Sequence, residues 1–108
     1  MIIAFDVDGT LISNIDDSPK IEIINFLKSF SKSDTILVWS GGGCDYAKMW
    51  VERLDLSEYV LQTFTKCLEL RDWVDICFDD EDVHLAKFNI NINNKEIMTY
   101  LQNHHIVV

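Results

Sequence analysis

The chain has 108 residues, of which 48% are hydrophobic and 25% charged, a composition typical of one globular domain and too apolar for an intrinsically disordered chain. Its 9 Lys and Arg against 18 Asp and Glu give a formal net charge of −9, which disfavours nucleic acid as a partner because binding would release few counterions. No apolar run approaches the roughly 20 residues that span a bilayer, which argues against a membrane protein.

The three cysteines indicate a reducing compartment. Cys44, Cys67 and Cys77 form neither a C-x-x-C pair nor a zinc-binding spacing, and a sparse, odd count is typical of proteins without disulfides. The apolar start of the chain ends at Asp6 and has no basic segment before it, so it does not resemble a signal peptide. We therefore expect a cytoplasmic protein.

Short apolar runs separated by segments of helical periodicity indicate strands that alternate with helices. The expected strands are, in chain order, residues 2–5, 36–39, 59–61 with Phe64, Val74 with 76–78, and 88–92. The last run alternates apolar and polar residues and is expected at an edge of the sheet. Residues 106–108 are expected to form a sixth strand or a docked tail.

The first helix is expected to begin with Ser18 as its N-cap and Pro19 at its first position. The second and third helices are expected near residues 45–54 and 94–103, and a short helix near 83–86. Continuous apolar strands separated by helices form parallel sheets that are covered on both faces. We therefore predict a small three-layer α/β fold with about five strands, helices on both faces and no cap domain.

Three of the expected strands end in polar residues. Asp6 follows the first strand, Ser40 follows the second, and Asp79 with Asp80 follows the fourth. Ligands bind at the carboxyl ends of the strands in open parallel sheets. We therefore expect these side chains to meet at one edge of the sheet.

The first of these strand ends reads Asp6-Val7-Asp8-Gly9-Thr10, a D-x-D-G-T pattern that arises by chance in about one chain of this length in a thousand. Two carboxylates that flank one residue can divide the work of phosphoryl transfer. The first attacks phosphorus, and the second protonates the leaving oxygen and later deprotonates water. The simpler interpretation is an acidic turn, and the agreement among the three strand ends favours a site.

These residues resemble the motifs of the haloacid dehalogenase superfamily of phosphohydrolases. Asp6, Asp8 and Thr10 match its first motif, Ser40 matches its second, and the pair Asp79 and Asp80 matches its fourth. The resemblance covers nearly the whole chain, as a single core domain at residues 1–108, and implies a Rossmann-like sheet.

The resemblance implies a Mg²⁺-dependent phosphatase that hydrolyses phosphate monoesters. Asp6 is then the nucleophile that forms an aspartyl-phosphate, and Asp8 is the general acid and base. Mg²⁺ is expected to bind Asp6, the backbone carbonyl of Asp8 and Asp79, with Asp80 directly or through water. The expected phosphate-binding residues are Thr10, Ser40, Gly41, Gly42 and Lys66.

The phosphate-binding assignments have alternatives. The Ser40 hydroxyl and the amides of the glycines after it can hold phosphate at a helix N-terminus, but such glycines also form flexible turns. The family's third motif is a lysine. Lys66 fits its order in the chain best, although it lies rather close to Asp79; Lys87 comes after the acidic pair, and Lys48 is expected in solvent on the second helix.

The segments 12–18 and 62–75 are too short for the cap domain that many members of the family insert there. We therefore expect an open site, unless a neighbouring subunit of a homo-oligomer covers it. The expected substrates are a phosphorylated small molecule, a nucleotide or a phosphopeptide. The alternative function is a regulatory or binding protein that keeps the Mg²⁺ and phosphate site without turnover, and the sequence does not separate hydrolysis from phosphotransfer to another acceptor.

Overall fold

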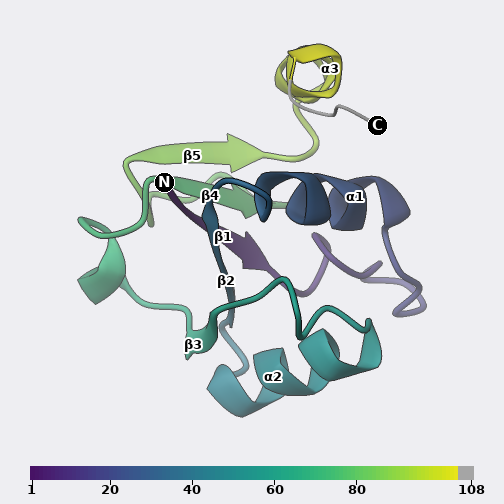
Figure 1. Ribbon diagram of the computed structural model, residues 1–108, viewed down its shortest axis with the longest axis vertical. Helices are drawn as coiled ribbons and strands as arrows, with labels where there is room; N and C mark the ends of the chain where they lie inside the picture. The colour runs from purple at the N-terminus through teal and green to yellow at the C-terminus, as the bar shows by residue number, and fades with distance from the viewer. Residues whose placement is uncertain (105–108) are drawn as a thin grey trace.

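The computed structural model describes residues 1–104 and contains, within them, a five-stranded sheet, three α-helices and one 3₁₀-helix. The strands are β1 (Ile2–Asp6), β2 (Thr35–Ser40), β3 (Gln62–Thr65), β4 (Ile76–Asp79) and β5 (Phe88–Asn91), and the helices are α1 (Ile21–Phe30), α2 (Cys44–Arg53), η1 (Leu68–Leu70) and α3 (Lys95–His104). All strands are parallel, in the order β3-β2-β1-β4-β5 (Figure 1). This confirms the predicted α/β class, and β5 lies at an edge, as its alternating pattern predicts.

The two faces of the sheet are covered differently. On one face, Ile3 and Phe5 of β1 pack in a cluster with buried residues of all three α-helices. On the other face, Ala4 of β1 packs against residues of η1 and of the loops around it. The second helical layer of the prediction is therefore reduced to a 3₁₀-helix and loops, because the connections at residues 66–75 and 80–87 are too short for a full α-helix.

β3 lies later in the chain than its apolar run predicts. Tyr59 forms a turn, donating its N–H to the carbonyl of Leu56 at 2.9 Å, and Leu61 only leads into the strand, donating to the carbonyl of Ile36 at 2.9 Å. β3 is an edge strand with exposed Gln62 and Thr65. A strand of this kind needs no continuous apolar run, which is why the pattern misplaced it.

α1 begins at Ile21 rather than at Pro19. Pro19 pairs with Ile12 in an antiparallel bridge, so it belongs to an extended segment before the helix. The Ser18 hydroxyl donates to Oδ1 of Asp16 at 2.7 Å and does not cap the helix. Local side-chain bonding of this kind competes with N-capping, and the sequence signal for the cap was therefore wrong.

The expected short helix near residues 83–86 is also wrong. The side-chain oxygen of Asn89 accepts the N–H groups of Leu85 and Ala86, at 2.8 and 3.0 Å, and so replaces the helical hydrogen bonds there. The expectation for residues 106–108 lies outside the described residues. Within residues 1–104, every helix is too short or too polar to cross a membrane.

Candidate active site

The carboxyl ends of three neighbouring strands meet at one edge of the sheet. β1 ends at Asp6, β2 at Ser40 and β4 at Asp79, and all three residues are buried. These three side chains line a pocket of about 220 Å³. All the site residues predicted from the sequence line this pocket except Thr10, and Asn14 and Glu81 line it as well.

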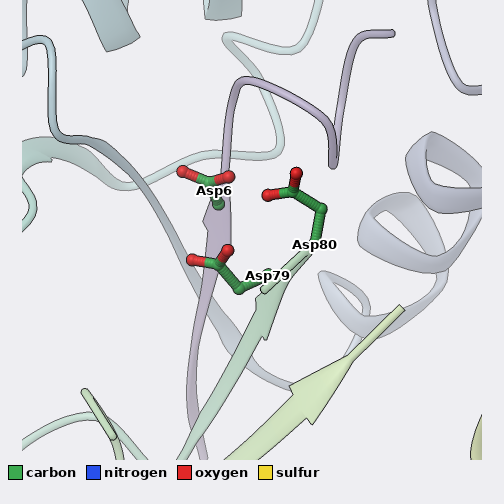
Figure 2. A group of neighbouring side chains, drawn as sticks. All are labelled: Asp6, Asp79 and Asp80. Atoms are coloured by element: carbon green, nitrogen blue, oxygen red, sulfur yellow. The ribbon is translucent and has the colours of Figure 1, made fainter. Parts of the chain in front are cut away.

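Three carboxylates converge in this pocket. Asp6 at the end of β1 and the adjacent Asp79 and Asp80 at the end of β4 each offer an oxygen, and these oxygens lie within 4.8 Å of one another (Figure 2). Buried carboxylates at this spacing repel each other strongly unless cations neutralise them. The geometry is therefore that of a candidate cation site built from oxygen ligands.

Lys66 supplies one cation to this cluster. Its Nζ lies 3.0 Å from Oδ1 of Asp6 and 2.7 Å from Oδ2 of Asp79. Its backbone N–H donates to the carbonyl of Ser40 at 2.9 Å, which fixes the start of this loop directly after β3. Burial alone lowers the pKa of Lys66, but the hydrogen bonds and charges of Asp79 and Asp6 outweigh it and raise the pKa, so the ammonium stays charged.

The other two lysines that the sequence left open lie elsewhere. Lys87 pairs with Asp75 at 3.3 Å. Asp75 directly precedes β4 and Lys87 directly precedes β5, so this pair lies at the amino ends of the strands, opposite the pocket. Lys48 is exposed on α2. Of the three candidates, Lys66 alone reaches the carboxylates.

One ammonium does not balance the cluster. The pKa of Asp6 is raised from 3.8 to about 7, first by burial and then by the charge of Asp79, and Lys66 offsets only part of this rise. The raised pKa means that burial and the neighbouring carboxylate together disfavour the anionic form of Asp6. A cation next to Asp6 would favour that form.

The turn after β1 requires a glycine. Gly9 has φ +80°, and a side chain there would overlap the Asp80 carboxylate and the Asn14 amide. The amide of Asn14 donates to Oδ2 of Asp80 at 3.1 Å, and Nζ of Lys20 donates to the carbonyl of Gly9 at 2.9 Å. Gly9 therefore allows the backbone of this turn to lie close to the acidic pair.

Thr10 does not reach the pocket. It is fully buried, and its hydroxyl donates to Oδ2 of Asp6 at 3.3 Å. The expectation that Thr10 binds phosphate is therefore not supported, because its side chain faces the Asp6 carboxylate instead. Its position suits a residue that orients Asp6.

Ser40 and the glycines after it form a tight turn into α2. The Ser40 Oγ accepts the N–H of Gly42 at 3.0 Å, and the Ser40 carbonyl accepts the N–H of Gly43 at 3.2 Å. Because Oγ is the acceptor in the first bond, its own O–H is available as a donor toward the pocket. Gly41 and Gly42 are exposed at the pocket rim.

Asp8 stands apart from the other carboxylates. It is exposed, and its Oδ1 accepts the hydroxyl of Tyr46 at 2.7 Å. This hydrogen bond raises the pKa of Tyr46. The Asp8 carboxylate does not belong to the cluster of three, so any contact of Asp8 with a cation there rests with its backbone carbonyl.

Sequence reasoning missed three residues of the site. They are Tyr46 in the first turn of α2, Asn14 in the segment 12–18, and Glu81 directly after the acidic pair. For Asn14 and Glu81 a signal existed, since both lie within a few residues of a predicted motif in a loop at the same edge. Comparison of the chain with protein-family models, curated proteins and solved structures gave no significant match.

Proposed function

We propose that this protein is a Mg²⁺-dependent phosphomonoesterase related to the haloacid dehalogenase superfamily. The observation that carries the proposal is the convergence of Asp6, Lys66 and the acidic pair Asp79 and Asp80 in one pocket at the strand ends. Four separate segments of the chain contribute to that pocket, and the residues occur in the order of the family motifs. Chance placement of an acidic turn does not account for this agreement.

The donor set fits Mg²⁺. Mg²⁺ binds oxygen ligands and is commonly held by one or two carboxylates together with water and phosphate oxygens. Asp6, Asp79 and Asp80 present such oxygens, and burial together with the charge of Asp79 raises the pKa of Asp6 despite the nearby Lys66. When bound, the cation supplies electrostatic neutralisation of a phosphoryl group beside the anionic nucleophile.

The charge of the pocket makes a divalent cation necessary for a phosphate ligand. Among its lining residues, the carboxylates of Asp6, Asp8, Asp79, Asp80 and Glu81 face the single ammonium of Lys66. A phosphate ester is itself an anion, and such a pocket repels it. We therefore propose that substrate and cation bind together.

The chemistry then follows from the residues. A carboxylate oxygen of Asp6 attacks phosphorus, the bond from phosphorus to the ester oxygen breaks, and Asp8 gives that oxygen its proton. The Asp8 carboxylate next takes a proton from water, whose oxygen attacks the phosphorus of the aspartyl-phosphate. Inorganic phosphate leaves, and Asp6 returns as a carboxylate with Asp8 protonated. Lys66 holds Asp6, and the Ser40 hydroxyl donates to a phosphate oxygen.

The substrates that this proposal favours are phosphorylated small molecules, nucleotides and phosphopeptides. The segments 12–18 and 62–75 carry no inserted cap in the structure, so the pocket is open to solvent or to a neighbouring subunit of a homo-oligomer. The three cysteines are all free, which accords with the proposed cytoplasmic location.

The test is the release of phosphate from p-nitrophenyl phosphate with Mg²⁺ and with a chelator, for the wild type and Asp6→Asn. We expect Mg²⁺-dependent release that falls by at least about a thousandfold in Asp6→Asn, because the amide is a poor nucleophile. Asp72→Asn, the same change at an exposed position outside the pocket, is the matched control. Release that survives in Asp6→Asn contradicts the mechanism, and Mg²⁺-dependent binding of vanadate without turnover favours the binding protein.

A further inference from the structure

The contact between Tyr46 and Asp8 has no evident structural purpose. The Tyr46 hydroxyl donates to Oδ1 of Asp8 at 2.7 Å, and the Asp8 side chain is exposed. A hydrogen bond to an exposed carboxylate adds little stability, because water offers that carboxylate the same kind of partner. The contact therefore points to what Asp8 does in the pocket.

Asp8 differs from the three clustered acids of the pocket in how it is held. Lys66 fixes Asp6 and Asp79, and Asn14 fixes Asp80. Asp8 lies outside this network, and an exposed carboxylate that is not held samples several rotamers. The Tyr46 hydroxyl supplies the hydrogen bond that selects one of them.

Tyr46 itself is well supported. It is the third residue of α2, and its ring packs partly against the helical side of the core. The backbone of Gly42 lies close to the ring, since a Cβ on Gly42 would be 3.3 Å from Cδ2 of Tyr46. A phenol ring held in this way has few alternative positions, so its hydroxyl is a fixed reference point for Asp8.

We propose that Tyr46 is a positioning residue that orients Asp8 for proton transfer to the leaving oxygen, an inference that rests on the proposed function. Because Oδ1 accepts the Tyr46 hydroxyl in both protonation states of Asp8, Oδ2 carries the proton that is transferred. In the attack step the Oδ2–H bond breaks and the proton moves to the ester oxygen as its bond to phosphorus breaks. Tyr46 keeps its own proton throughout.

Two esters of similar shape test this assignment. Phenyl phosphate releases a basic oxygen that needs a proton, whereas p-nitrophenyl phosphate releases a stabilised phenolate that needs little help. We expect Tyr46→Phe to lower kcat/KM for phenyl phosphate about tenfold and for p-nitrophenyl phosphate less than twofold. The quantity kcat/KM is the appropriate readout because it reports the steps up to departure of the phenol.

Two further variants separate positioning from a structural effect. Tyr100→Phe removes the same hydroxyl from an exposed site on α3 and is expected to leave both esters unaffected. In an Asp8→Asn background, Tyr46→Phe is expected to cause no further loss, because it acts through Asp8. An equal loss for the two esters, or a loss that adds to that of Asp8→Asn, overturns the inference while leaving the phosphatase intact. Absence of release from both esters by the wild type overturns the proposed function itself, and the inference with it.

Discussion

The amino ends and the carboxyl ends of the strands both carry a lysine–aspartate pair, and the two ends differ in how charge is balanced. At the amino ends of the strands, Lys87 lies 3.3 Å from Asp75, whose other oxygen accepts the N–H of Ile2 at 2.7 Å, and the lysine side chain is 55% exposed. At the carboxyl ends, Lys66 serves both Asp6 and Asp79, whose side chains are 7% and 2% exposed. The amino ends thus carry a pair of equal and opposite charges near solvent, and the carboxyl ends carry a buried excess of negative charge.

The carboxyl pKa values show the same contrast. The pKa of Asp75 is lowered, chiefly by the N–H of Ile2 and further by Lys87. The pKa of Asp6 is raised to about 7 by burial and by Asp79. A buried excess of like charge lowers the stability of a fold, and the Mg²⁺ that we propose for this site would offset that cost.

The largest expected difference is between the two lysines. Lys66→Met removes the ammonium from the buried cluster, and we expect a loss of about 2–3 kcal/mol in the free energy of unfolding without metal and a loss of phosphate release of on the order of a hundredfold or more. Lys87→Met removes an exposed partner and is expected to change activity less than twofold and the melting temperature by about 1–2 °C. Urea unfolding, thermal unfolding and the phosphate assay measure these effects on the two variants. Equal effects of the two substitutions contradict the contrast.

The next effect concerns crowding at the carboxyl edge. Gly9→Ala places a Cβ at φ +80° against Asp80 and Asn14, and we expect a loss of about 2 kcal/mol in the free energy of unfolding together with weaker Mg²⁺ binding. Gly41→Ala is the matched control, because nothing lies near its Cβ position, and its expected effect is below about 0.5 kcal/mol. Urea unfolding curves of the two variants measure this difference. A free energy of unfolding that is unchanged in Gly9→Ala argues against the tight turn at Gly9.

The last prediction concerns how the stability of the metal-free protein depends on pH. The pKa of Asp6 is near 7 in the folded protein and 3.8 when unperturbed, so the folded state binds this proton more tightly. The stability that Asp6 contributes is therefore fully present below about pH 4 and is lost as the pH rises to about 7. Asp75 acts in the opposite direction, because its lowered pKa gives stability that is lost as the pH falls below about 3.8.

Asp6→Asn is expected to remove the fall in stability between about pH 4 and 7, and Mg²⁺ is expected to reduce it in the wild type by stabilising the Asp6 carboxylate. Thermal unfolding across this pH range, with and without Mg²⁺, is the measurement. A stability that rises with pH over this interval in the metal-free wild type is incompatible with the raised pKa of Asp6.

Much of the fold, and the strand ends that form the site, could be predicted from the sequence. The apolar runs of β1, β2 and β4 stop at Asp6, Ser40 and Asp79, and parallel strands bring their carboxyl ends to one edge. The bounds of α2 and α3 were predicted to within one residue at each end. These elements have patterns that local physics determines, namely buried strands and amphipathic helices.

The rest depends on tertiary contacts. β3 is a polar edge strand, and the start of α1 is set by the pairing of Pro19 with Ile12 rather than by the Ser-Pro signal. Lys66 was selected only by its order along the chain. The contact of Tyr46 with Asp8 joins residues 38 positions apart, and helical periodicity does not tell which side chain of a first turn reaches across to another loop.

The most direct measurement traps the covalent intermediate on Asp6. In Asp8→Asn, attack on p-nitrophenyl phosphate continues because the leaving group needs little protonation, while activation of water is lost, so the aspartyl-phosphate accumulates. After acid quenching in the presence of Mg²⁺, mass spectrometry is expected to find one phosphoryl group on the peptide that contains Asp6, and none in the double variant Asp6→Asn with Asp8→Asn. A phosphoryl group on any other residue, or phosphate release by the wild type with no labelled protein in Asp8→Asn, would contradict the account.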